Sequence, residues 1–172
     1  MKNIDQVKLD FVAKWGLIGT KWGVNKTMGQ IFALLTLSES ALSTDEVMEI
    51  LCISRGHANT SLRELVSWGI VTKSSPIGSR KEFFAAESDQ WKVACLVAKA
   101  RREKEIIPAI ETLEETLLEL KKLKTNKHQK FLINRLNLIL EFMQMCNVIL
   151  KFVSVSEKSV IASWVQKILK KF

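Results

Sequence analysis

Apolar residues recur at helical spacing between residues 43 and 69, in two runs separated by a short break. Ser43, followed three positions later by Glu46, has the capping-box pattern that begins a helix. A second start signal stands at Ser54, and Gly69 fits the left-handed position just beyond a helix end. The apolar residues of the second run repeat at i, i+4, i+7 and i+8: Ala58, Leu62, Leu65 and Val66. The pattern predicts a helix, a tight turn and a second helix.

Two short β-prone runs follow Gly69, over residues 70–73 and 82–86. The turn between them contains Pro76 and Gly78, and its far end carries Ser79, Arg80 and Lys81. A hairpin with cationic residues at its tip can lie along a phosphate backbone. We therefore predict a mainly α fold with a small β-hairpin wing, which is the order of a winged helix-turn-helix.

Residues 4–20 predict an amphipathic helix at the start of the chain. The run WGLIGTKWG overlaps its end, and we expect its glycines to loosen the chain there: Gly16, Gly19 and Gly23. Trp15 and Trp22 fit buried packing anchors better than an aromatic ligand site.

A long helix is predicted from Asp89 to about Lys124, with a kink or restart at Pro108, because proline removes a helical hydrogen bond. Two heptad seams follow. The first is Ile106, Ile110, Leu113, Leu117 and Leu120, and the second is Leu132, Leu136, Ile139, Met143, Cys146, Leu150 and Val153. They predict an antiparallel helix pair or a dimerisation arm, and both remain open here.

The apolar residues between Phe131 and Val153 nearly encircle their helix, which predicts burial on several sides. Their polar interruptions argue against a membrane span. A basic amphipathic helix over residues 157–171 is expected to pack on a partner subunit in preference to a membrane surface. These patterns divide the chain into a winged-helix domain, 1–87, and a helical dimerisation and effector region, 88–172.

The outer face of the second helix combines small residues, hydrogen-bonding residues and arginine. Base edges in the major groove are read by such side chains, and bulky groups prevent the approach. An ordinary solvated helix face has a similar composition, but a basic hairpin directly behind it favours DNA. The candidate DNA contacts are Ser54, Arg55, His57, Asn59, Thr60, Arg63, Ser79, Arg80 and Lys81.

The chain has 172 residues, 47% of them hydrophobic, which is ample for a core. Its formal net charge of +8 favours nucleic acid or an anionic membrane surface as a partner. Cys52, Cys95 and Cys146 form no disulfide or zinc pattern, so reduced thiols are expected, with redox sensing the alternative. The start lacks a signal-peptide pattern, and we predict a cytoplasmic protein.

The histidines His57 and His128 fall on the second helix and in a polar loop. Neither stands in a catalytic or metal-binding motif, so we predict no enzyme activity, no metal and no cofactor.

The segments NKTMG, ISRGHANTSLREL, WGIV, GSRKEFF and RREKEIIPAI, in this order, resemble the GbsR/MarR family of transcriptional regulators over roughly residues 10–110. The resemblance implies a homodimeric winged-helix DNA binder that usually represses transcription. By position it puts Ser54, Arg55, Asn59, Thr60 and Arg63 on the recognition helix, and Arg80 and Lys81 on the wing. Cys52 stands where the family often has Gly or Asn, while His57 and Asn59 replace its commoner residues.

The resemblance also allows a small-molecule effector. A quaternary ammonium effector requires aromatic faces, which Trp and Phe have to supply because the chain has no tyrosine.

The sequence thus predicts a regulator that binds a pseudo-palindromic operator in double-stranded DNA as a homodimer. The alternative is a helical protein-interaction or membrane-surface adaptor that uses the winged helix without reading DNA, since fold alone does not fix function.

Overall fold

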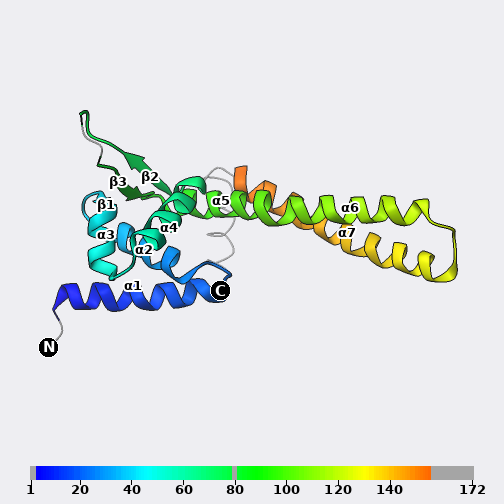
Figure 1. Cartoon of the computed structure of the whole chain (residues 1–172), viewed down its shortest axis with the longest axis horizontal. Coiled ribbons are helices and arrows are strands. Elements are labelled where there is room, and N and C mark those ends of the chain that lie inside the picture. The colour runs from blue at the N-terminus through cyan, green and yellow to red at the C-terminus, as the bar shows by residue number, and fades with distance from the viewer. Residues whose placement is uncertain (1–2, 79–80, 156–172) are drawn as a thin grey trace, which may run out of the picture. The chain divides into compact units, whose positions relative to one another are not determined.

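The computed structural model describes residues 3–78 and 81–155. The chain divides into two compact units, Met1–Val93 and Ala94–Phe172 (Figure 1). Each unit has its own packing and is described separately. The helix predicted over 157–171 and the wing residues Ser79 and Arg80 lie outside the described residues.

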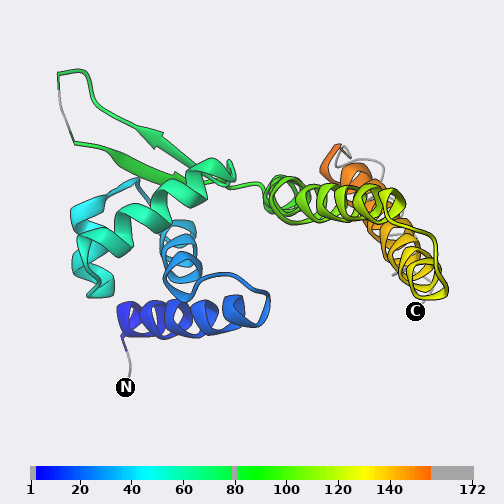
Figure 2. The same cartoon turned by 45° about the vertical axis from the view of Figure 1, so that its right-hand side comes forward.

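Among its described residues, the first unit contains four helices and three short strands before α5 begins. In chain order these are α1 (Ile4–Lys21), α2 (Lys26–Thr36), β1 (Leu42–Ser43), α3 (Thr44–Leu51), α4 (Arg55–Ser67), β2 (Val71–Ser74) and β3 (Phe83–Ala86). The predicted helix-turn-helix and hairpin are confirmed as α3, α4 and β2–β3. The hairpin with its connecting turn, residues 71–86, is called the wing below, and its strands β2 and β3 project from the unit in Figure 2.

A third strand, which the sequence pattern does not predict, completes the sheet. The order is β1-β3-β2, all antiparallel. Phe84 in the central strand lies opposite Leu42 on one side and Lys73 on the other. β1 has only two residues, which is too short for an alternating pattern to reveal it.

The predicted capping box at the start of α3 is confirmed. The Glu46 N–H donates to Ser43 Oγ at 3.4 Å, and the Ser43 N–H donates to Glu46 Oε2 at 2.7 Å. The Ser43 hydroxyl also donates to that carboxylate, and the hydrogen bonds from Ser43 hold the pKa of Glu46 below its ordinary value.

The turn between α3 and α4 contains the one non-glycine residue with positive φ in the part of the chain described, Cys52 at φ 51°. This is the left-handed conformation that glycine adopts without steric cost. Ser54 then caps α4, its Oγ accepting the His57 N–H at 3.4 Å. Gly69, at φ 76°, ends the helix region as predicted.

The core of the first unit lies where α2, α3, α4 and the sheet meet. Its largest members are at most 4% exposed: Ile31, Leu34, Val47, Leu62, Leu65, Val71 and Phe84. The predicted apolar side of α4 is therefore its buried side, which leaves the opposite side to solvent.

The expectation that glycines loosen the end of α1 is wrong for Gly16 and Gly19, whereas Gly23 lies in the turn after the helix at φ 74°. α1 runs through Gly16 and Gly19 to Lys21. Gly16 and Gly19 are buried, and a Cβ added to Gly29 of α2 would lie 3.3 Å from the Gly16 Cα. At this crossing the glycines allow the two helix backbones to approach closely.

The expectation of a buried anchor is wrong for Trp22, which is 64% exposed. Trp15 is half-buried and meets the edge of Trp22 at 6.4 Å between ring centroids. Phe11 stacks on Trp15 at 5.5 Å. The three rings form a partly exposed aromatic row along the end of α1.

The second unit contains the rest of α5 (Gln90–Arg101), a π-helical segment η1 (Arg102–Ile106), α6 (Ile107–Lys122) and α7 (Lys127–Val155). The helix is irregular near Pro108, as predicted, but the irregular segment begins upstream of the proline. The Ile107 N–H donates to the carbonyl of Arg102, five residues earlier. This wider turn accommodates the proline, whose ring clashes with the carbonyl four residues before it in a regular helix.

α6 and α7 form an antiparallel helix hairpin, side by side in both views (Figures 1 and 2). The first predicted seam lies at their contact, with Leu117 buried and its other members half-buried. Gln129, 6% exposed, closes the hairpin: its Nε2 donates to the Leu120 carbonyl at 2.6 Å and to that of Leu123 at 3.2 Å. His128 lies in the first turn of α7, not in a loop as predicted.

α7 is not buried on several sides, contrary to prediction. One side packs on α6, and the opposite side is apolar and about half exposed, as at Phe142 with 57% and Ile149 with 53%. By length and composition α7 could also cross a membrane, because an 18-residue window has a mean hydropathy of 1.6. The polar interruptions noted in the sequence therefore do not exclude a span by this measure.

Candidate nucleic-acid interface

The outer face of α4 is open to solvent within the first unit. Arg55, His57, Thr60 and Arg63 are exposed, and Asn59 is half-buried. Ala58, Leu62 and Leu65, on the other side, are at most 1% exposed. The helix is thus fixed by its apolar side and presents hydrogen-bonding groups and guanidinium groups on its free side.

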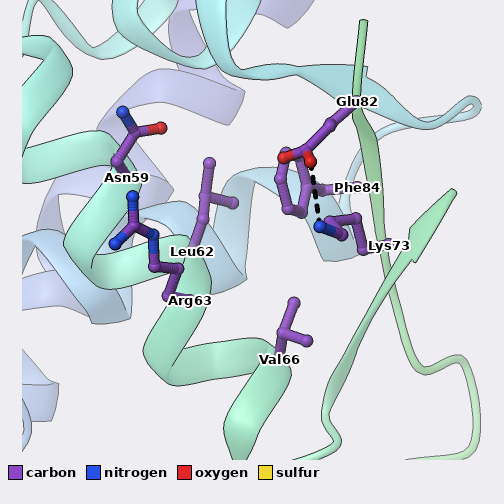
Figure 3. A pocket seen from close by; sticks show the side chains of 7 residues that line it. All are labelled: Asn59, Leu62, Arg63, Val66, Lys73, Glu82 and Phe84. Carbon is purple, nitrogen blue, oxygen red and sulfur yellow. Dashed lines mark hydrogen bonds and ion pairs between the residues drawn. The ribbon is translucent and has the colours of Figure 1, made fainter. Parts of the chain in front are cut away.

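A groove of about 290 Å³ separates α4 from the wing (Figure 3). Asn59 and Arg63 stand on the helix side, and Lys73 and Glu82 on the strand side. Leu62, Val66 and Phe84 supply its apolar lining. The groove therefore joins the two surfaces that a winged helix presents to a ligand.

The wing side of this groove carries an ion pair that is not among the predictions from sequence. Lys73 Nζ lies 2.9 Å from Glu82 Oε1, and both side chains are about half exposed. Lys73 is opposite Phe84 in the ladder, and Glu82 precedes Phe84 by two residues. Alternation along strands puts all three on one face of the hairpin, the face toward α4. The shared face of these three side chains follows from the register of the hairpin and not from the sequence alone.

A second hollow, of about 320 Å³, lies between the first turns of α2 and α4. Thr27 and the cap residue Asn25 line it from α2, and Ser54, His57 and Thr60 line it from α4. Asn25 Oδ1 accepts the Thr27 N–H at 2.9 Å. Helix N-termini carry partial positive charge, which favours an anion here, whereas the Glu64 carboxylate that also lines the hollow opposes one. The sequence does not predict that Thr27 lies beside the candidate residues of α4, because α2 and α4 are distant in sequence and come together only in the folded protein.

Two predicted DNA contacts already have partners inside the protein. Arg55 Nη2 lies 2.5 Å from Asp45 Oδ1, which links the start of α4 to the start of α3. At the wing, Lys81 is exposed, and its Nζ lies 5.6 Å from the centroid of the Phe83 ring. Arg55 is therefore oriented before any ligand arrives.

Other titratable contacts lie away from α4. The Lys92 ammonium lowers the pKa of the Glu87 carboxyl, and Glu87 raises the pKa of Lys92, across a 2.5 Å ion pair at the start of α5. Within residues 3–78 and 81–155, no group of three His, Cys, Asp or Glu side chains could hold a metal ion. Cys52 is exposed, Cys95 is buried and Cys146 is half-buried.

Together the fold and this surface define a winged helix-turn-helix domain. No family model and no curated protein matches the sequence. Among solved structures, the chain is similar to a crystal structure of a transcriptional regulator, with a TM-score of 0.66 and 15% identity. The match covers 84% of this chain and 92% of the other. At this identity the likeness establishes a common fold.

Proposed function

We propose that this protein is a sequence-specific DNA-binding transcriptional regulator. The observation that carries the proposal is the open, arginine-bearing face of α4 beside the wing groove. A protein-docking version of this surface needs exposed apolar anchors, and this face offers Asn59, Thr60 and Arg63 instead. The structural neighbour, itself a transcriptional regulator, supports the same class.

In the proposed complex α4 enters the major groove. Arg63 and Asn59 donate and accept hydrogen bonds at base edges, with arginine suited to guanine and asparagine to adenine. The N-termini of α2 and α4, with Thr27 and His57, face the phosphate backbone. Lys81 and Arg80 on the wing contact the neighbouring backbone. The proposal takes the protein to be cytoplasmic and to act by binding DNA, not by catalysis.

The test begins by recovering bound genomic DNA fragments, which yields an operator sequence. Arg63→Ala is then expected to weaken operator binding by about 1–3 kcal/mol while leaving binding to random DNA nearly unchanged. Lys81→Ala is expected to weaken both and to reduce the salt slope by about one unit. Lys14→Ala, which removes one charge from α1, is the matched control. Operator specificity unchanged in Arg63→Ala refutes the assignment of α4.

We further propose that it acts as a homodimer through the exposed side of α7. Apolar residues on that side recur with alternating steps of three and four, interrupted only at Arg135: Phe131, Leu138, Phe142, Met145, Ile149 and Phe152. This is a second heptad seam, about 30 Å long at 1.5 Å per residue, beside the one used against α6. Such a repeat fits another helix, and a second copy of α7 offers an identical seam.

Sedimentation velocity tests this proposal. The wild-type protein is expected to be a dimer and Phe142→Glu a monomer, because the substitution puts a charge in the seam. Gln144→Glu, on the exposed polar side of α7, is the control and stays dimeric. A wild-type monomer contradicts the proposal, as does recovery of the protein in the membrane fraction, which instead favours α7 in a bilayer.

Repression through an overlapping promoter, relieved by a small-molecule effector, is the mode of action that the GbsR/MarR resemblance supports. A reporter gene placed behind the recovered operator tests it: expression rises when the regulator is deleted.

A further inference from the structure

The groove between α4 and the wing contains a carboxylate where the proposed function needs cations. Glu82 lines the same groove as Arg63 and Asn59 and pairs with Lys73 at 2.9 Å. In Figure 3 the pair lies across the groove from Arg63. A phosphate that enters the groove therefore meets Glu82 as well as Lys73.

We propose that Glu82 competes with DNA phosphate for the Lys73 ammonium, and thereby weakens the phosphate-dependent part of binding to DNA of any sequence. The proposal rests on the proposed function. It makes Glu82 a residue that lowers DNA affinity through Lys73, without reading a base itself.

The exposure of the pair makes the exchange feasible. The Lys73 and Glu82 side chains are 48% and 47% exposed, and exposed ion pairs contribute little to stability. Lys73 can thus leave Glu82 for a phosphate without disturbing the fold, but the carboxylate then lies unpaired close to the DNA.

The penalty is easiest to measure on DNA of random sequence. Non-specific binding consists almost entirely of phosphate contacts, so the loss of one effective cation lowers both its affinity and its salt dependence. Operator binding adds hydrogen bonds from Arg63 and Asn59 to base edges, on the other side of the groove, which do not involve the carboxylate. A random-sequence duplex therefore isolates the contribution of Glu82.

Asp45 and Arg55 repeat the arrangement at the start of α4, at 2.5 Å. That pair links two helices, so removal of its carboxylate also perturbs the turn between them. The wing pair gives the cleaner test, because Lys73 and Glu82 lie within one hairpin.

The experiment is a fluorescence-anisotropy titration of a random-sequence duplex over a potassium chloride series, with the full chain. Glu82→Gln is expected to bind about two- to fivefold more tightly and to steepen the slope of log K against log salt by about 0.9. Glu39→Gln is the matched control, since it makes the same charge change in the exposed loop before β1. It is expected to leave the slope at the wild-type value.

Lys73→Gln and the double variant Lys73→Gln/Glu82→Gln separate competition from bulk charge. If Glu82 acts mainly through Lys73, Glu82→Gln has a clearly smaller effect in the Lys73→Gln background, where only direct repulsion by the carboxylate remains. The inference is overturned, without affecting the proposed function, by any of three results. These are a full effect of Glu82→Gln in the Lys73→Gln background, an effect on binding no larger than that of Glu39→Gln, and weaker binding by Glu82→Gln. A wild-type protein that binds no duplex at low salt overturns the proposed function together with it.

Discussion

Alanine substitution is expected to stabilise the protein at Gly19 of α1 but not at Gly16. Both glycines are buried within the same helix, where alanine is favoured over glycine by about 1 kcal/mol. They differ in what the added methyl group meets. The pair thus separates the intrinsic preference of the helix from the space available at its contact with α2.

At Gly19 the nearest heavy atom to an added Cβ is the Val24 Cβ, at 3.7 Å, an ordinary contact. Gly19→Ala should therefore raise the free energy of unfolding by up to about 1 kcal/mol. At Gly16 the same Cβ overlaps Gln30 Cγ and lies 2.9 Å from the carbonyl oxygen of Lys26. The Gln30 side chain can rotate away, but the carbonyl belongs to the backbone of α2.

Relief of that contact requires α2 to shift, and overpacking of this kind costs about 1–3 kcal/mol. The cost offsets or exceeds the helix preference, so Gly16→Ala should be about 1–3 kcal/mol less stable than Gly19→Ala. Urea unfolding followed by tryptophan fluorescence measures both free energies, and equal m-values verify that the two-state comparison holds. Equal stability of the two variants refutes the close packing of α1 against α2.

Three further substitutions test other parts of the chain. Cys52→Gly should raise the free energy of unfolding by about 0.5–1 kcal/mol in a urea titration, because glycine adopts φ 51° without steric cost. Gln129→Leu should lower the thermal midpoint in circular dichroism, since the carbonyls of Leu120 and Leu123 lose their donor, at a cost of about 1–3 kcal/mol. Glu46 has a pKa lowered by Ser43 from an ordinary value of 4.5. Its carboxylate stabilises the fold above that value, and the contribution is lost as the pH falls through the lowered pKa. Acid titrations between about pH 5 and pH 3 should therefore show a smaller stability loss for Glu46→Gln.

Local signals in the sequence were enough to predict the helix-turn-helix. Ser43 and Glu46 form their capping box within four residues, and Gly69 adopts positive φ because glycine has no Cβ. The irregularity at Pro108 is equally local in origin, but its form as a π-helical segment is not predictable, because a simple bend also accommodates the ring. Features fixed by neighbours in sequence are predictable to within a few residues.

The incorrect predictions concern contacts between residues distant in sequence. A buried glycine such as Gly16 and a flexible one look the same in the sequence without the partner helix. The hydrophobicity of Trp22 does not say that its ring, just beyond the end of α1, is left exposed. For α7 the composition predicted burial, but α6 covers only one of its two seams. In each case the deciding contact lies far away in sequence.

Some residues of the candidate site are likewise predictable from local sequence, and others are not. Helical periodicity located Arg63 and Asn59, since the apolar stripe of α4 fixes which side faces outward. The same reasoning could not find the carboxylates, because Glu82 meets Lys73 across nine residues and Asp45 meets Arg55 across ten. The affinity of such a surface for DNA depends on how many of its cations are already neutralised within the protein. The net charge of +8 therefore overstates the attraction of the α4 and wing surface for phosphate, and the salt slope measured on random DNA should correspond to fewer phosphate contacts than a count of its lysines and arginines implies.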